Sequence, residues 1–220
     1  VSDIDVELDY ESDSVAKSTQ PGGGFSASAV SGNTNQAIAT SSTTATGGIR
    51  GTGAIHTGTI DVLVEGNGST ANADVDGKKV TLDGVSVGLN YAQSNLNMTQ
   101  SAYMEGSSIH ATGAVTVKSL MNEIGSTSEL GSNGGASVSL VSGSTQWSDA
   151  NASMKNSAFI GGTVNIDTTG ALQVLSESNK LTVSAKAEAG NVAASVAALD
   201  IVATHAKIEG MNTEAFIGGN

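Results

Sequence analysis

Two histidines and an aspartate hold the same place in three similar segments of the chain. His56, His110 and Asp167 each follow an isoleucine and precede a short threonine- and glycine-containing stretch that leads into an alternating apolar run. If these segments stack, the three side chains form a column with neighbours about 4.8 Å apart. Imidazole and carboxylate groups in such a column could bind a transition metal. A repeat aligns any residue type in this way, so the favoured interpretation is a ladder of surface side chains.

A second group with ligand chemistry lies near the N-terminus, where residues 3–11 alternate between acidic and apolar types. The pattern predicts a strand with its apolar residues facing inward and a row of carboxylates about 7 Å apart facing outward. Such a row could hold Ca²⁺ weakly, or it could be a solubilising face that discourages sideways strand pairing. Neither an EF-hand loop nor a Gly-Gly-x-Gly-x-Asp repeat is present. The weak calcium candidates are Asp3, Asp5, Glu7, Asp9 and Glu11.

Nothing in the sequence indicates catalysis. The chain has no cysteine, no Gly-x-Ser-x-Gly elbow, no His-Glu-x-x-His and no phosphate loop. The carboxylates of Asp149, Asp167, Asp200 and Glu214 are scattered along the chain, and regular repetition argues against a unique site. We therefore expect no enzyme, no catalytic residue and no resident cofactor. Trp147 could stack on a sugar, but a role in covering the edge of one repeat is favoured.

Composition narrows the partners and the architecture. Nine basic residues against 21 acidic ones give a net charge of −12, which excludes a nucleic-acid footprint and disfavours an anionic membrane surface. No apolar stretch approaches a membrane span, so we expect no membrane insertion. Glycine, alanine and serine supply 86 of the 220 residues, while aromatic residues make up 3 %. A chain of this kind favours a repetitive β architecture in which small residues pack in narrow layers.

Three sequence markers recur with a period of 55 to 57 residues. One is the set of isoleucine-containing segments described above. The second is a turn dipeptide at 76–77, 133–134 and 190–191, with Pro21 to Gly24 near the corresponding place upstream. The third closes each unit at 49–51, 104–106, 160–162 and 217–219. The markers predict one solenoid domain over residues 1–220, with repeats of approximately 1–57, 58–112, 113–169 and 170–220.

Each repeat contains too little apolar surface for a core of its own, so the copies must stack. We predict an all-β, parallel β-helix-like solenoid. The length of the repeat leaves two alternatives open: two ordinary rungs, or one rung with a projecting hairpin at the turn dipeptide. The strand from Val192 to Ile208 is predicted to be buried between layers. Ile160 and Ile217 are predicted to face inward, so that an aspartate at either position would disrupt stacking.

Neither end of the sequence carries the atypical capping unit usual for a solenoid, which predicts that the 220 residues are an excerpt of a longer array. In spacing and residue style the chain resembles the repeat regions of giant secreted bacterial adhesins and haemagglutinin-like exoproteins of the leukotoxin-like filamentous type. The likeness is carried by residues 113–117 and 170–174, by the small-residue stretch 135–140, and by the closing segments 158–161 and 215–218.

The resemblance implies a right-handed parallel β-helix shaft outside the cell, with no catalytic residues. We therefore expect a structural, extracellular or cell-surface shaft, whose partners are neighbouring repeats and a host-cell or matrix surface. A different possibility is a subunit whose copies stack end to end into a filament. A third is a β-helix that binds or cleaves carbohydrate.

Overall fold

The computed structural model describes residues 2–20, 25–77, 80–106, 108–131, 136–162, 164–188 and 192–218. These residues form four parallel β-sheets and contain no helix. The first sheet contains β1 (Ile4–Tyr10), β5 (Ile60–Asn67), β9 (Val115–Asn122) and β13 (Leu172–Ser178). The second contains β2 (Asp13–Gln20), β6 (Thr70–Gly77), β10 (Ile124–Leu130) and β14 (Leu181–Ala187). The third contains the long strands β3 (Phe25–Arg50), β7 (Val80–Glu105), β11 (Ala136–Gly161) and β15 (Val192–Ile217). The fourth contains β4 (Ala54–Thr57), β8 (Ser108–Ala111) and β12 (Asn165–Thr168).

Every strand pairs with the equivalent strand of the neighbouring repeat. In the first sheet Ile4 pairs with Ile60, Ile60 with Val115 and Val115 with Leu172, at separations of 56, 55 and 57 residues. Relative to β11, the long strand of the last repeat contains one extra residue, Gly210. It adopts a φ of 62° and lies next to a shift in the register. The structure thus confirms an all-β fold with parallel sheets, and its register reproduces the period of the sequence markers.

The pairing contradicts the hairpin alternative. The strands on either side of each turn dipeptide, such as β14 and β15, belong to different sheets, and every strand pair among the described residues is parallel. Because equivalent strands pair at a separation of one whole repeat, the stacked unit is the repeat of 55 to 57 residues and not half of it. Of the turn markers, only Asp76 and Gly77 lie within the described residues.

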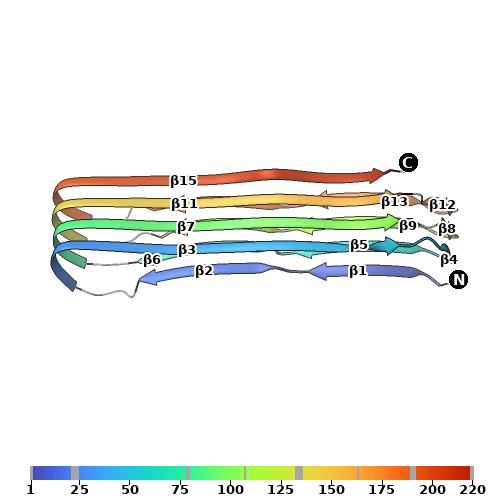
Figure 1. Cartoon of the computed structure of the whole chain (residues 1–220), viewed down its shortest axis with the longest axis horizontal. Coiled ribbons are helices and arrows are strands. Elements are labelled where there is room, and N and C mark those ends of the chain that lie inside the picture. The colour runs from blue at the N-terminus through green and yellow to red at the C-terminus, as the bar shows by residue number, and fades with distance from the viewer. Residues whose placement is uncertain are drawn as a thin grey trace.

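The sheets form two layers (Figure 1). The long strands make one layer, and the first and second sheets lie end to end along its other side, where both pack against it. A strand of 26 residues spans roughly 80 Å, so the molecule is long in the direction of its strands and short in the direction of stacking (Figure 1). The fourth sheet lies at the end where the long strands terminate.

The residue types that fill the core between the layers change along the strands. Near the fourth sheet it contains branched and long side chains such as Ile60, Val62, Met104 and Ile160. Near the opposite end alanine predominates, with Ala37, Ala39, Ala73 and Ala92 buried together. Small side chains there allow the two layers to approach closely, which accounts for the alanine-rich composition.

The long strands bend at one position in every repeat. The register omits Ala29, Gly84, Leu140 and Val196, so pairing is interrupted at the same place in all four strands. The ribbons of these strands curve sharply near that end of the molecule (Figure 1). A Cβ on Gly84 would lie 2.6 Å from the carbonyl oxygen of Ala29, so a side chain at this position of β7 would collide with the backbone of β3.

The strand from Val192 to Ile208 is not buried between layers, contrary to the prediction. It belongs to β15, which pairs only with β11 and forms one edge of the third sheet. Its apolar side chains Val196, Leu199 and Ile208 are exposed. The apolar pattern on both faces therefore reflects an unpaired edge and not enclosure.

The two isoleucines predicted to face inward, Ile160 and Ile217, differ in solvent exposure for the same reason. Ile160 is 2 % exposed within the core near the fourth sheet, whereas Ile217 is 62 % exposed on the edge strand. The inward assignment holds for the column that contains both, because Met104, Ile160 and Ile217 are in register. Only Ile160, however, has neighbours on both sides.

We therefore expect Ile160→Asp to lower the free energy of unfolding by at least about 3 kcal/mol, because a carboxylate would enter an apolar cluster. Ile217→Asp, the matched control, should change it by less than about 1 kcal/mol. Urea denaturation followed by circular dichroism measures both. Equal losses for the two variants would contradict the burial of Ile160 relative to Ile217.

Candidate functional site

A concave polar surface lies on the outward face of the long-strand sheet. It is a shallow hollow of about 400 Å³ over the middle of β7, β11 and β15. Outward residues alternate with buried ones along β7 and β11, so each of these strands supplies every second side chain, and β15 follows the same register. Its polar lining consists of Asn95, Asn97, Asp149, Asn151, Ser153, His205, Lys207 and Glu209.

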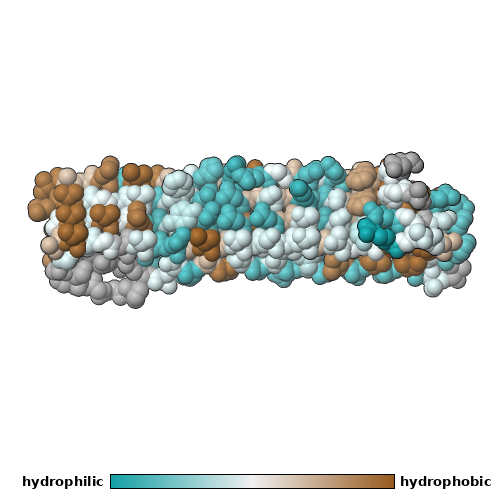
Figure 2. Space-filling view, viewed as in Figure 1, coloured by the Kyte–Doolittle hydropathy of each residue, from teal (hydrophilic) through white to brown (hydrophobic). Residues whose placement is uncertain are grey.

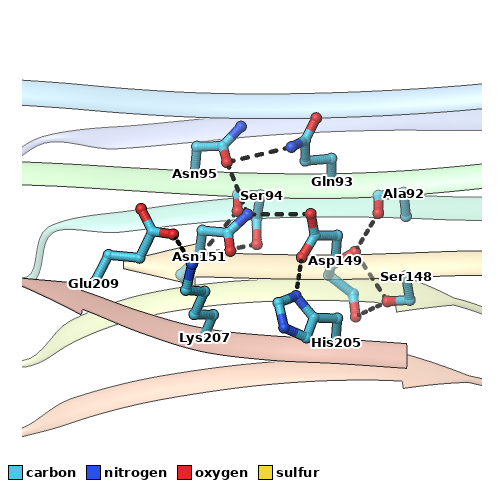
Figure 3. Close-up of polar contacts among 12 residues, drawn as sticks. Ala92, Gln93, Ser94, Asn95, Ser148, Asp149, Asn151, His205, Lys207 and Glu209 are labelled. Carbon is cyan, nitrogen blue, oxygen red and sulfur yellow. Dashed lines mark hydrogen bonds and ion pairs between the residues drawn. The ribbon is translucent and has the colours of Figure 1, made fainter. Parts of the chain in front are cut away.

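These side chains bind one another across repeats (Figure 3). The Nδ2 of Asn151 donates to Oδ1 of Asn95 at 3.2 Å and to Oδ2 of Asp149 at 3.2 Å. The other oxygen of Asp149 lies 3.1 Å from Nδ1 of His205, and Lys207 pairs with Glu209. Asp149 therefore orients the imidazole of His205, and the row forms a continuous polar ladder along the stacking direction.

Two aromatic side chains border this hollow. Trp147 is two residues before Asp149 on the same face of β11, pairs in register with Tyr91 of β7, and is 48 % exposed. Partial burial and the nearby negative charge of Asp149 raise the pKa of Tyr91. The aromatic ring of Trp147 beside amide and carboxylate groups is a surface that could bind a neutral sugar. Its role in covering the edge of one repeat stays a prediction.

The histidine column predicted from the sequence is present. His56, His110 and Asp167 are in register on the fourth sheet. The two imidazole rings stack with centroids 4.9 Å apart and planes 9° apart, and Nδ1 of His110 lies 3.4 Å from the carboxylate of Asp167. Ring stacking places the imidazole faces, and not the lone pairs, toward each other, which is the geometry of a surface ladder. Within the described ranges no three metal-ligating side chains converge.

The acidic strand alternates as predicted. Along β1, Ile4, Val6, Leu8 and Tyr10 are half-buried and the intervening carboxylates are exposed. Two of the five calcium candidates already accept hydrogen bonds from the next repeat. The backbone N–H of Thr59 donates to Asp3 at 2.8 Å, and Nδ2 of Asn67 donates to Asp9 at 2.9 Å. Asp5, Glu7 and Glu11 project to solvent, and calcium binding by this row stays a prediction.

A buried amide column escaped the sequence analysis. Gln100 and Asn156 are in register and each is 1 % exposed. Nε2 of Gln100 donates to the carbonyl oxygens of Val64 at 2.7 Å and Leu120 at 3.0 Å, near the junctions where the first sheet gives way to the second. The buried amide thus finds hydrogen-bond partners on the backbone of the first sheet. The alternation of the sequence could have revealed this burial. From Leu96 to Met104 every second residue is apolar except Gln100, which therefore falls among the inward-facing positions.

Comparison with protein-family models, with curated proteins and with solved structures gave no match. The described part of the chain also includes no helix with the length and hydropathy needed to cross a bilayer.

Replacing Gln100 by leucine should destabilise the protein by about 3 kcal/mol, because two buried carbonyl oxygens and the hydroxyl of Tyr10 lose their partner. Gln93→Leu is the matched control, since Gln93 lies on the outward face of the same strand, and it should cost less than about 0.5 kcal/mol. Denaturation midpoints measure both. Similar midpoints for the two variants would show that the buried amide is not needed.

Tyr10 provides a test of burial through its titration. Its hydroxyl donates to Oε1 of Gln100 at 2.7 Å, and burial raises its pKa to about 12. Because the unfolded phenol ionises near its ordinary pKa of about 10, stability should be lost as the pH rises from that value through the folded pKa. The tyrosinate absorbance of the wild type minus that of Tyr10→Phe measures the pKa. A difference titration near pH 10 would contradict the buried position of this side chain.

Proposed function

We propose that the chain is a structural, non-catalytic segment of an extracellular or cell-surface bacterial protein of the adhesin or exoprotein kind, folded as a β-solenoid shaft. The observation that carries the proposal is the stacking of all four repeats, each of which adds one strand to three parallel sheets in the same register. The polar side chains on the surface are largely engaged in ladders between repeats, as in Asn95, Asn151 and Asp149. Side chains committed to holding repeats together fit a structural role.

The geometry favours stiffness and width over reach. Each repeat of 55 to 57 residues advances the stack by about 4.8 Å, whereas the strands extend roughly 80 Å across it. Each step therefore joins neighbours through a ladder along 26 residues of long strand and along the shorter strands opposite. A shaft built this way gains little length per residue but resists bending and shear, since many backbone hydrogen bonds must break together.

The edge strand β15 supports a stack that continues in the same direction. Ile208 and Met211 are 52 % and 58 % exposed, while their register partners on β11, Ala152 and Met154, are buried. A further repeat of this kind laid on β15 would bury these columns. That repeat could belong to the same polypeptide, as in a shaft, or to another copy, as in the alternative of a filament subunit that assembles end to end.

Carbohydrate binding is the other candidate function, and it rests on the hollow beside Trp147. Its amides and carboxylates offer both donors and acceptors to hydroxyl groups, and its only cation among the described lining residues, Lys207, is paired with Glu209. This chemistry suits a neutral sugar rather than an anionic one.

The purified 220-residue chain should give single particles of constant size in negative-stain microscopy and light scattering, whose longest dimension is set by the strands. Millimolar Ca²⁺ should leave them unchanged, because a shaft segment has no assembly activity of its own. On intact cells of the source organism, antibodies against the chain should label the surface, and external protease should remove that label.

Other outcomes would redirect the proposal. Filaments that Met211→Lys abolishes would establish end-to-end assembly instead of a shaft, since Met211 lies on the stacking edge. A change on adding calcium would give the acidic strand a function. Label that is reached only after permeabilising the cells would contradict an extracellular role.

A further inference from the structure

The five methionines of the chain differ sharply in exposure, and all five lie within the described residues. Met98, Met104, Met121 and Met154 are each at most 2 % exposed, whereas Met211 is 58 % exposed. The chain has no cysteine, so its sulfur chemistry is confined to these thioethers. Met211 is therefore the one methionine whose side chain is presented to small solutes.

Met211 lies at the open end of a buried methionine column. Met98, Met154 and Met211 are in register on β7, β11 and β15. The first two pack between the layers in an apolar cluster with Leu96 and Ala152. Among the described strands β15 pairs only with β11, so one side of the Met211 thioether has no strand beside it.

The exposure of Met211 comes from this missing neighbour and not from a place on the outward face. That face is hydrophilic over its middle (Figure 2), where β15 contributes Lys207 and Glu209. Met211 belongs instead to the inward row of β15, together with Ile208, whose register partner Ala152 is buried. A further repeat paired with β15 would cover this row.

An exposed thioether is open to oxidation by hydrogen peroxide. An electron pair of the sulfur forms a bond to one peroxide oxygen, the O–O bond breaks, and the other oxygen leaves as water. The sulfur is oxidised to a sulfoxide and the peroxide is reduced. Burial keeps the peroxide away from the other methionine sulfurs.

We propose that Met211 is the oxidation site of this chain, open to peroxide where β15 ends the stack and protected where a further repeat covers it. Protection rests on the proposed shaft function, in which the stack continues beyond β15. The sulfoxide oxygen is a hydrogen-bond acceptor, and stacking would bury it among apolar side chains. An oxidised edge is therefore a poor platform for the next repeat, so the site couples the redox state of the surroundings to stacking.

Peptide mapping by mass spectrometry, after a timed exposure of the folded chain to hydrogen peroxide, tests the site. Met211 should gain oxygen at least about 10-fold faster than the four buried methionines, which react only when the fold opens. Met211→Leu should abolish the fast reaction and leave the unfolding midpoint unchanged, because the residue is exposed. Slow oxidation of Met211, or equally fast oxidation of Met154, would overturn the assignment.

Protection is tested on the protein made by the source cells. After the same treatment, Met211 of that protein should be oxidised at least about 10-fold more slowly than in the isolated chain. Equal rates would overturn protection by a further repeat. The surface label on intact cells judges the extracellular location separately, so the two results are distinguishable.

Met211→Gln tests the effect on stacking, because it places a polar side chain of similar length in the column. On cells, external protease should cut this variant near β15 at least about 10-fold faster than the wild type, since the next repeat packs poorly there. Met211→Leu is the matched control and should resist protease as the wild type does. Both variants of the isolated chain should unfold at the wild-type midpoint. Equal protease resistance of the two variants would overturn the coupling of oxidation to stacking.

Discussion

Backbone hydrogen bonding between repeats is the constraint on which the structure depends. Consecutive strands within a repeat fall in different sheets, so a single copy cannot satisfy its own N–H and C=O groups. Each strand must find its partner one repeat away, and the long strands do so over 26 residues. The repeats therefore fold only as a stack, and a residue type that suits one position must suit its equivalents above and below.

The side chains specify the register of that ladder. Opposite charges fall in the same column where Lys17 pairs with Asp74 at 3.2 Å and Lys186 with Glu129 at 3.2 Å. The rings of Phe159 and Phe216 likewise stack with centroids 5.2 Å apart. An exposed ion pair adds little stability by itself. A slip of one residue, however, would reverse the inward and outward faces of a whole strand, so these columns act together with the apolar alternation to fix one alignment.

The same columns explain what the sequence could and could not predict. The period, the alternation of residues 3–11 and the alignment of His56 with His110 follow from residue types that recur visibly, and the structure contains each of them. The assignment of strands to sheets did not follow, because a turn dipeptide looks alike whether the chain returns as a hairpin or passes to another sheet. The bend left no common signal either, since Gly84 and Leu140 share no side-chain property. Tertiary packing determines both features.

Apolar residues are consequently exposed for two distinct reasons in this fold. On β15 they occupy inward columns that lack a neighbour, so they report an unpaired edge and are complementary to another repeat. On β7 and β11 they remain exposed although both edges are paired, so no amount of stacking buries them. The exposed apolar side chains of β15 and those of β7 and β11 therefore lie on different surfaces, an edge of the sheet and its outer face.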